Sequence, residues 1–162
     1  PMHGIVINQY KESFENFYSQ FKDIVLTLGK IFPLKKGNRV SLISTKIFDG
    51  TESQYKTIYQ NLFTYKSANP FEWDNRIAEK RYILGDSEEI NSISNIKRGE
   101  MISPFFNNGR PKSVLAFSVD SNTAPSKAEN RFTFANSIKA YDELYQNNLR
   151  LLKELNRYEN IW

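Results

Sequence analysis

Apolar residues near the start of the chain recur in alternating steps of four and three. The run consists of Tyr10, Phe14, Phe17, Phe21, Ile24, Leu28 and Ile31. This spacing places the side chains on one stripe of an α-helix and is typical of a coiled-coil seam. Asn8 is a suitable N-cap and Pro33 ends the pattern, so the sequence predicts a helix over residues 8–32.

A second stripe of the same kind lies near the C-terminus. Its members are Phe134, Ile138, Tyr141, Tyr145, Leu152 and Leu155, with Asn148 where the spacing calls for an apolar residue. Ser126 and Glu129 fit a capping box and predict a helix from about residue 127 to 160. A helix of roughly 45 Å exceeds the width of a domain of this size. We therefore expect its distal part, from residue 149, to protrude, to pair with another chain or to fray.

Between the two helices the pattern is mixed and rich in strands. Alternation and β-branched residues predict strands over residues 39–48, 55–63, 80–84, 100–106 and 112–119. Residues 64–75 are expected to form a long connection, and residues 86–90 a short helix that begins at Asp86 or Ser87. Asn107-Asn108-Gly109 supplies the turn of a hairpin. The elements predict one α+β domain over residues 8–162, preceded by a lead of residues 1–7 such as an expression vector adds.

Residues 99–121, GEMISPFFNNGRPKSVLAFSVDS, resemble the hairpin of GAF domains. That family shows an apolar strand, a Pro, a Gly-containing turn and a Val-Leu pair before a closing Asp-Ser, here Val114-Leu115 and Asp120-Ser121. The segment RVSLI at residues 39–43 is similar to the first strand of the family. The resemblance implies a central antiparallel sheet of five or six strands with helices on one or both faces. It also implies a small-molecule pocket on one side of the sheet and parallel dimers joined through the flanking helices.

The resemblance also assigns candidate site residues. A ligand would lie under the connection 64–75, and its candidate contacts are Tyr65, Phe71, Trp73, Tyr82 and Arg98. Ordinary core packing of the aromatic residues and a solvated surface arginine are the alternatives. The candidate dimerisation residues are Phe14, Phe21, Leu28, Tyr145, Asn148, Leu152 and Leu155. Asn148 would fix the register of the helix pair. The alternatives are helices that only cover their own core and an Asn148 that lies on the surface.

The composition removes several kinds of chemistry. The chain has no Cys, and its single His is His3, so thiolate, disulfide, haem-ligand and His-based acid–base chemistry are not expected. The acids Asp86, Glu88 and Glu89 could bind a hard cation, but the start of a helix explains them without a metal. Glu100 and Asp120 flank the hairpin, and nothing in the sequence brings them together. We expect no cofactor, no metal and no catalytic residues.

The charge pattern does not point to a further class of partner. A net charge of +4 with mixed signs along the chain does not suggest a nucleic-acid partner. The sequence analysis thus predicts a non-catalytic GAF-like sensory or regulatory domain that binds a small organic ligand or a protein partner and forms a homodimer. A neighbouring effector domain or membrane segment outside this chain would carry the output, and the domain would be cytoplasmic, either free or as the cytosolic part of a membrane-anchored protein. A ligand-free GAF-like scaffold for protein assembly is the alternative.

Overall fold

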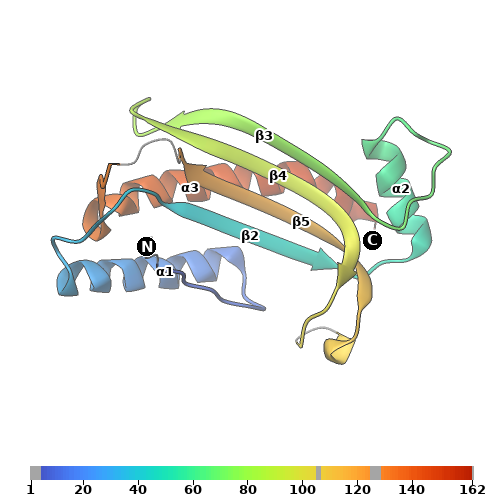
Figure 1. The fold of residues 1–162 in the computed structure, drawn as a ribbon, viewed down its shortest axis with the longest axis horizontal. Coiled ribbons are helices and arrows are strands. Elements are labelled where there is room, and N and C mark those ends of the chain that lie inside the picture. Colours follow the sequence, from blue (N-terminus) through green and yellow to red (C-terminus); the bar gives the residue numbers. More distant parts are fainter. Residues whose placement is uncertain (1–4, 105–106, 125–128, 162) are drawn as a thin grey trace.

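The computed structural model describes residues 5–104, 107–124 and 129–161, and these residues form a mixed α+β fold (Figure 1). This fold class confirms the α+β prediction. The helices are α1 (Phe14–Ile31), α2 (Glu52–Leu62) and α3 (Phe134–Leu155), with 3₁₀ segments η1 (Asn107–Gly109) and η2 (Asn156–Ile161). The strands are β1 (Lys36–Gly37), β2 (Ser41–Phe48), β3 (Trp73–Ile83), β4 (Glu88–Met101), β5 (Lys112–Thr123) and β6 (Phe132–Thr133).

The main sheet is antiparallel and has the strand order β2-β5-β4-β3, while β1 and β6 form a separate pair. The central pairing sets Ile96 of β4 opposite Phe117 of β5, and both side chains lie in the core. Within the described part of the chain the main sheet therefore has four strands, where the resemblance implied five or six. Each of these strands pairs with the next one in space by antiparallel hydrogen bonding.

Helices α1 and α3 lie side by side on one face of the sheet, and the opposite face carries no helix in Figure 1. The two apolar stripes meet each other within the chain. Tyr18 stacks on Tyr145 with ring centroids 4.1 Å apart, and Phe21 meets Tyr141 edge-on at 4.7 Å. At the other end of this contact, a Cβ added to Gly29 would come within 3.3 Å of Phe134. Glycine there permits the close approach of the two helices.

Both terminal helices are shorter than the sequence predicted. Ser13, not Asn8, caps α1 by accepting a hydrogen bond from the backbone N–H of Asn16 at 3.1 Å. Thr133 caps α3 in the same way, and the predicted capping residue Ser126 lies outside the described residues. Beyond Leu155 the chain turns into η2, and the ring of Tyr158 is buried 6.2 Å from that of Phe117. The segment from residue 149 to Tyr158 therefore packs onto the core of its own chain and does not protrude.

The predicted strand over residues 55–63 is wrong, because this segment belongs to helix α2. Thr51 and Gln54 form a complete capping box at the start of α2. Tyr55, Ile58 and Tyr59 are buried, which is the spacing of one helical face. The loss of this strand accounts for part of the difference in the number of strands.

The predicted short helix over residues 86–90 is also wrong. Leu84, Gly85 and Asp86 have φ angles of 54°, 61° and 64°, so the chain reverses there in a tight turn. Strand β4 begins directly after this turn, at Glu88. The predicted strands over residues 39–48 and 112–119 are confirmed as β2 and β5, and the strand over 80–84 is the end of the longer β3. Of the predicted strand over 100–106, only Glu100 and Met101 belong to a strand, at the end of β4. Residues 105–106 lie outside the described part.

Candidate functional site

The predicted aromatic pocket is not formed around Trp73. The Trp73 side chain is buried, with the rings of Tyr59 and Phe63 at 6.2 and 5.6 Å between centroids. Helix α2 and the residue that follows it supply both rings. The space beside Trp73 is thus filled by aromatic core packing, which was the alternative interpretation of this residue.

The other three aromatic candidates do not pack against Trp73. Tyr65 and Phe71 are 75% and 81% exposed, so neither covers a pocket. Tyr82 is exposed on the opposite side of β3 from Trp73, and its hydroxyl donates to Glu89 at 3.3 Å. Since alternate residues of a strand face opposite sides of the sheet, Trp73 and Tyr82 cannot line one site.

Arg98 is buried and has partners within the chain. Only 4% of the residue is exposed, and its guanidinium donates to Glu52 Oε1 at 2.6 Å and to the carbonyl of Pro70 at 3.2 Å. The same group lies 4.6 Å from the ring centroid of Tyr55. Arg98 thus ties β4 to the start of α2 and to the connection before β3.

Most residues predicted for dimerisation lie inside the chain. Phe21, Asn148, Leu152 and Leu155 are buried, so a second copy could not contact them in this conformation. Phe14 packs on Tyr145 with ring centroids 5.0 Å apart. Phe14 and Leu28 on α1 and Tyr145 on α3 are half-buried. The stripes of α1 and α3 pack against the sheet and against each other because both helices lie on the same face.

The acidic candidates have partners or lie apart. Glu88 is buried and pairs with Arg131 at 2.7 Å, and Glu89 pairs with Lys80 at 2.9 Å. Glu100 and Asp120 lie opposite residues 113 and 43. They are therefore about 23 Å apart along the sheet, at 3.3 Å per residue, and on opposite faces. The described residues contain no group of three or more His, Cys, Asp or Glu side chains that could hold a metal ion.

A buried polar layer joins α3 to the middle of the sheet. Asn148 donates to the carbonyl of Leu42 at 2.8 Å and accepts from the Ser121 hydroxyl at 2.6 Å. Asn147 donates to Ser92 and Ser121 at 2.8 and 2.7 Å. Each amide is hydrogen-bonded, which removes most of the penalty of burying it.

The polar layer separates two apolar clusters. The first cluster is built on α1 and the first half of α3, and the second on α2, η2 and the second half of α3. The first contains Tyr18, Phe21, Val25, Val40, Leu42, Ile83, Ile90, Phe132, Ala140 and Leu144. The second contains Tyr55, Ile58, Tyr59, Trp73, Ile96, Leu115, Phe117, Val119, Leu151, Leu152, Leu155 and Tyr158.

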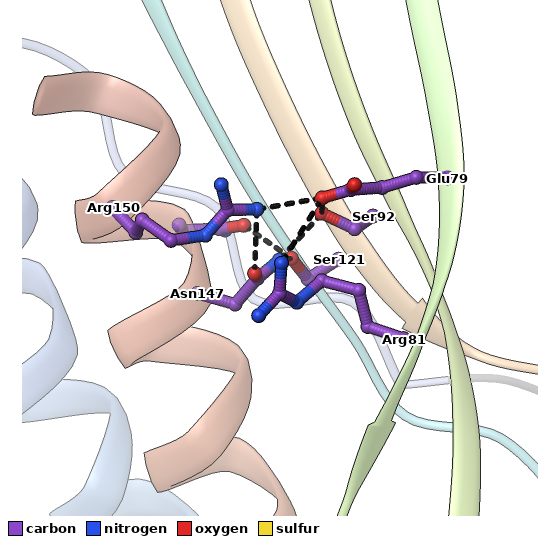
Figure 2. A network of polar contacts seen from close by, with 7 residues as sticks. Glu79, Arg81, Ser92, Ser121, Asn147 and Arg150 are labelled. Atoms are coloured by element: carbon purple, nitrogen blue, oxygen red, sulfur yellow. Dashed lines mark hydrogen bonds and ion pairs between the residues drawn. The ribbon is translucent and has the colours of Figure 1, made fainter. Parts of the chain in front are cut away.

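The polar layer continues to the surface in a charged cluster on β3 and α3. Figure 2 shows Arg150 and Arg81 approaching Glu79 from two sides, at 2.7 and 3.4 Å from Oε1. The same nitrogen of Arg150 donates to Asn147 Oδ1 at 3.2 Å. Burial opposes ionisation of Glu79, but hydrogen bonds from Arg81 and Arg150 outweigh it and lower the pKa of this carboxyl.

A shallow open cleft, which we call the α3 cleft, lies beside this cluster. Its lining residues are Arg81, Tyr82, Ile83, Ile90, Glu143, Gln146, Asn147 and Arg150. Ile83 and Ile90 are buried and form an apolar floor. Both oxygens of Glu143 accept a hydrogen bond from the backbone N–H of Leu84 at 3.0 Å, so this acid holds the β3–β4 turn. The other charged residues of the lining are Arg81 and Arg150, and both contact Glu79 beside the cleft.

A second surface feature is the apolar flank of α1. Ile24 and Ile31 are 42% and 60% exposed, and Leu28 between them is half-buried. A shallow groove along this flank is lined by Asp23, Ile24, Thr27 and Leu28. We call Ile24, Leu28 and Ile31 the α1 flank. These residues belong to the predicted stripe, and the structure leaves its C-terminal half open.

Sequence reasoning missed the α3 cleft for an identifiable reason. Its residues come from β3, β4 and α3, and no local spacing unites them. Of the predicted ligand contacts, only Tyr82 lines this cleft, and Asn148, which interrupts the apolar stripe, belongs to the polar layer beside it. Asn147 gives no signal beyond its position next to Asn148.

Comparison with models of protein families, with curated proteins and with solved structures found no match to this chain. The GAF resemblance therefore stays an expectation from the sequence pattern. Among the described residues, the helices are too short or too polar to span a membrane.

Proposed function

We propose that this chain is a non-catalytic assembly domain that pairs with a second copy through the α1 flank. The observation that supports this function is the division of the α1 stripe. Phe14, Phe17 and Phe21 pack in or against the core. Ile24 and Ile31 are exposed on one side of the helix, with the half-buried Leu28 between them. Apolar side chains aligned in this way on a surface helix are typical of interaction sites.

The charges beside the flank support a second copy as the partner. Asp23 and Lys30 are seven residues apart, hence on the same side of α1, and both are exposed. In an antiparallel pair of α1 helices centred near Thr27, Asp23 of each copy lies opposite Lys30 of the other. The same pairing sets Ile24 opposite Gly29 and hence within two residues, about 3 Å, of Ile31 of the other copy. The flank is therefore self-complementary in charge and in apolar contact, as a two-fold interface requires.

Sedimentation velocity over a range of protein concentrations tests this proposal. The wild-type chain should show a concentration-dependent dimer in the micromolar range, because a single helix contact is small. Ile24→Asp with Ile31→Asp should give a monomer. Leu26→Asp is the matched control, since Leu26 is 44% exposed on the same helix but is turned away from the flank. This control should keep the dimer.

A charge exchange sharpens the test. Lys30→Asp should weaken the dimer, and the double variant Asp23→Lys with Lys30→Asp should restore it. A wild-type chain that remains monomeric up to millimolar concentration contradicts the homotypic function. A dimer that survives the Ile24 and Ile31 changes would instead move the interface to another surface.

The second candidate function is the GAF-like regulatory one, with a neighbouring effector domain outside this chain. The observation that favours it is the polar layer, because hydrogen bonds lead from Arg150 in the α3 cleft through Asn147 to Ser92 on β4. A ligand or partner in the cleft would act directly on the contacts that hold this terminal helix. Hydrogen exchange of α3 peptides, followed while candidate ligands are added, tests this function.

A further inference from the structure

We propose that the α3 cleft binds a small molecule with a carboxylate at one end and a short aliphatic portion at the other. This inference names the ligand class of the second candidate function and rests on it. It does not depend on the α1 dimer.

The charged end of the cleft is suited to a carboxylate. Arg81 and Arg150 both contact Glu79, whereas Glu143, the acid of the cleft lining, is bound to the backbone N–H of Leu84. Glu79 already shows where a carboxylate fits between the two guanidinium groups (Figure 2). Its side chain is half-exposed, so it can swing into solvent when a ligand takes its place.

The Arg150 side chain is held in one position by a hydrogen bond to Asn147. Asn147 Oδ1 accepts from Arg150 Nη2 at 3.2 Å and fixes the side chain from below. The Nε atom of Arg150 is buried and has no hydrogen-bond partner in the structure. A planar guanidinium can offer this N–H together with a terminal one to the two oxygens of a carboxylate. An incoming carboxylate would therefore satisfy a donor that Glu79 leaves unbonded.

The rest of the cleft is suited to a hydrocarbon chain. Ile83 and Ile90 form the floor next to Arg81, and Gln146 forms the wall on α3. Each methylene group that leaves water here contributes about 0.8 kcal/mol to binding. Since the cleft is shallow and open, we expect short chains to bind weakly, in the millimolar range.

Hexanoate is the probe, and ¹⁵N-edited NMR titration of the full chain is the measurement. Hexanoate should shift the amide signals of Ile83, Ile90 and Asn147 in a saturable way. Hexylammonium has an alkyl chain of similar length with the opposite charge and should not bind. Acetate should bind at least tenfold more weakly than hexanoate, because it cannot cover the floor.

Four variants separate the carboxylate site from general charge effects. Arg150→Met and Arg81→Met should each weaken hexanoate binding about tenfold, because each removes a charge-assisted contact. Arg76→Met removes a charge from the opposite face of the same strand and should leave binding unchanged. Glu79→Gln should strengthen binding severalfold, since it removes the competing carboxylate while keeping the size of the side chain. Thermal unfolding of each variant verifies that it is folded.

The Glu79 variant decides between a binding role and a purely structural role for the cluster. If Glu79→Gln weakens hexanoate binding, or if Arg76→Met weakens it as much as Arg150→Met does, the proposal is overturned. Equal shifts with hexanoate and hexylammonium, or no saturable shift with hexanoate, overturn it as well. Sedimentation of the same samples shows separately whether the assembly function stands.

Discussion

At the scale of single residues, the two asparagines of α3 hold the helix to the sheet. Asn148 is fully buried, and both ends of its amide are hydrogen-bonded to groups on β2 and β5. A surface asparagine would make no such contacts. The interruption of the apolar stripe is therefore a specific polar contact with the sheet of the same chain, and not the register device of an intermolecular coiled coil.

Asn148→Ala should destabilise the chain by about 2–4 kcal/mol. The change leaves the Leu42 carbonyl and the Ser121 hydroxyl without their partner and opens a small cavity. Urea unfolding followed by circular dichroism measures the loss. Asn136→Ala, an exposed position on the same helix, should cost less than about 0.5 kcal/mol. Equal losses at the two positions would contradict the importance of the polar layer.

At the scale of elements, the contact between α1 and α3 depends on neutral tyrosines. Burial raises the pKa of Tyr141 to about 12. Burial and then the hydrogen bond to Asp142 raise the pKa of Tyr18 as well. An unfolded tyrosine loses its proton near pH 10, at a point where both phenols in the folded chain still hold theirs. The helix pair is consequently sensitive to alkaline pH.

The stabilisation from Tyr141 should be complete below about pH 10 and should disappear between about pH 10 and pH 12. For one buried phenol the loss is about 3 kcal/mol. Tyr141→Phe should make the fall in unfolding free energy above pH 10 less steep, because one of the titrating groups is gone. Urea titrations at pH 8, 9, 10 and 11 measure this fall. The exposed Tyr65→Phe serves as control, and an unchanged slope in Tyr141→Phe would refute the expectation.

The elements also show which parts of the fold could be predicted from the sequence. The stripes of α1 and α3 predicted two helices correctly, because a periodic pattern over many residues is hard to mistake. Helix α2 was misread as a strand because Thr57, Ile58 and Tyr59 favour strands, yet Thr51 and Gln54 carried a capping-box signal. The long-range partners could not be predicted. Arg98 and Glu52 meet only through the tertiary fold, and so do Glu88 and Arg131.

At the scale of the whole molecule, the core consists of two apolar clusters, but the same helix and strands contribute to both. Helix α3 and strands β2, β4 and β5 each run through both apolar clusters or link them at the polar layer. One cluster cannot unfold alone, because the other cluster would still hold the shared helix and strands in place. The two halves should therefore unfold together.

Hydrogen exchange with mass spectrometry at increasing urea tests this cooperativity. Peptides from α1 report on the first cluster and peptides from α2 on the second. Their midpoints should coincide within the error of the measurement, and Asn148→Ala should lower both midpoints by the same amount. Separate midpoints would mean that the polar layer is a boundary between two folding units.

The polar layer also gives α3 a discrete position along its axis. A slide by one helical turn, about 5.4 Å, would bring Leu144 or Leu151 opposite Ser92 and Ser121. Those hydroxyls would then lose their acceptors and donors, and the amides would enter an apolar cluster. Intermediate displacements break the same bonds without forming new ones. Helix α3 therefore cannot slide gradually along the sheet. If ligand binding in the cleft moves α3 along its axis, the helix must move in one step from one hydrogen-bonded position to another.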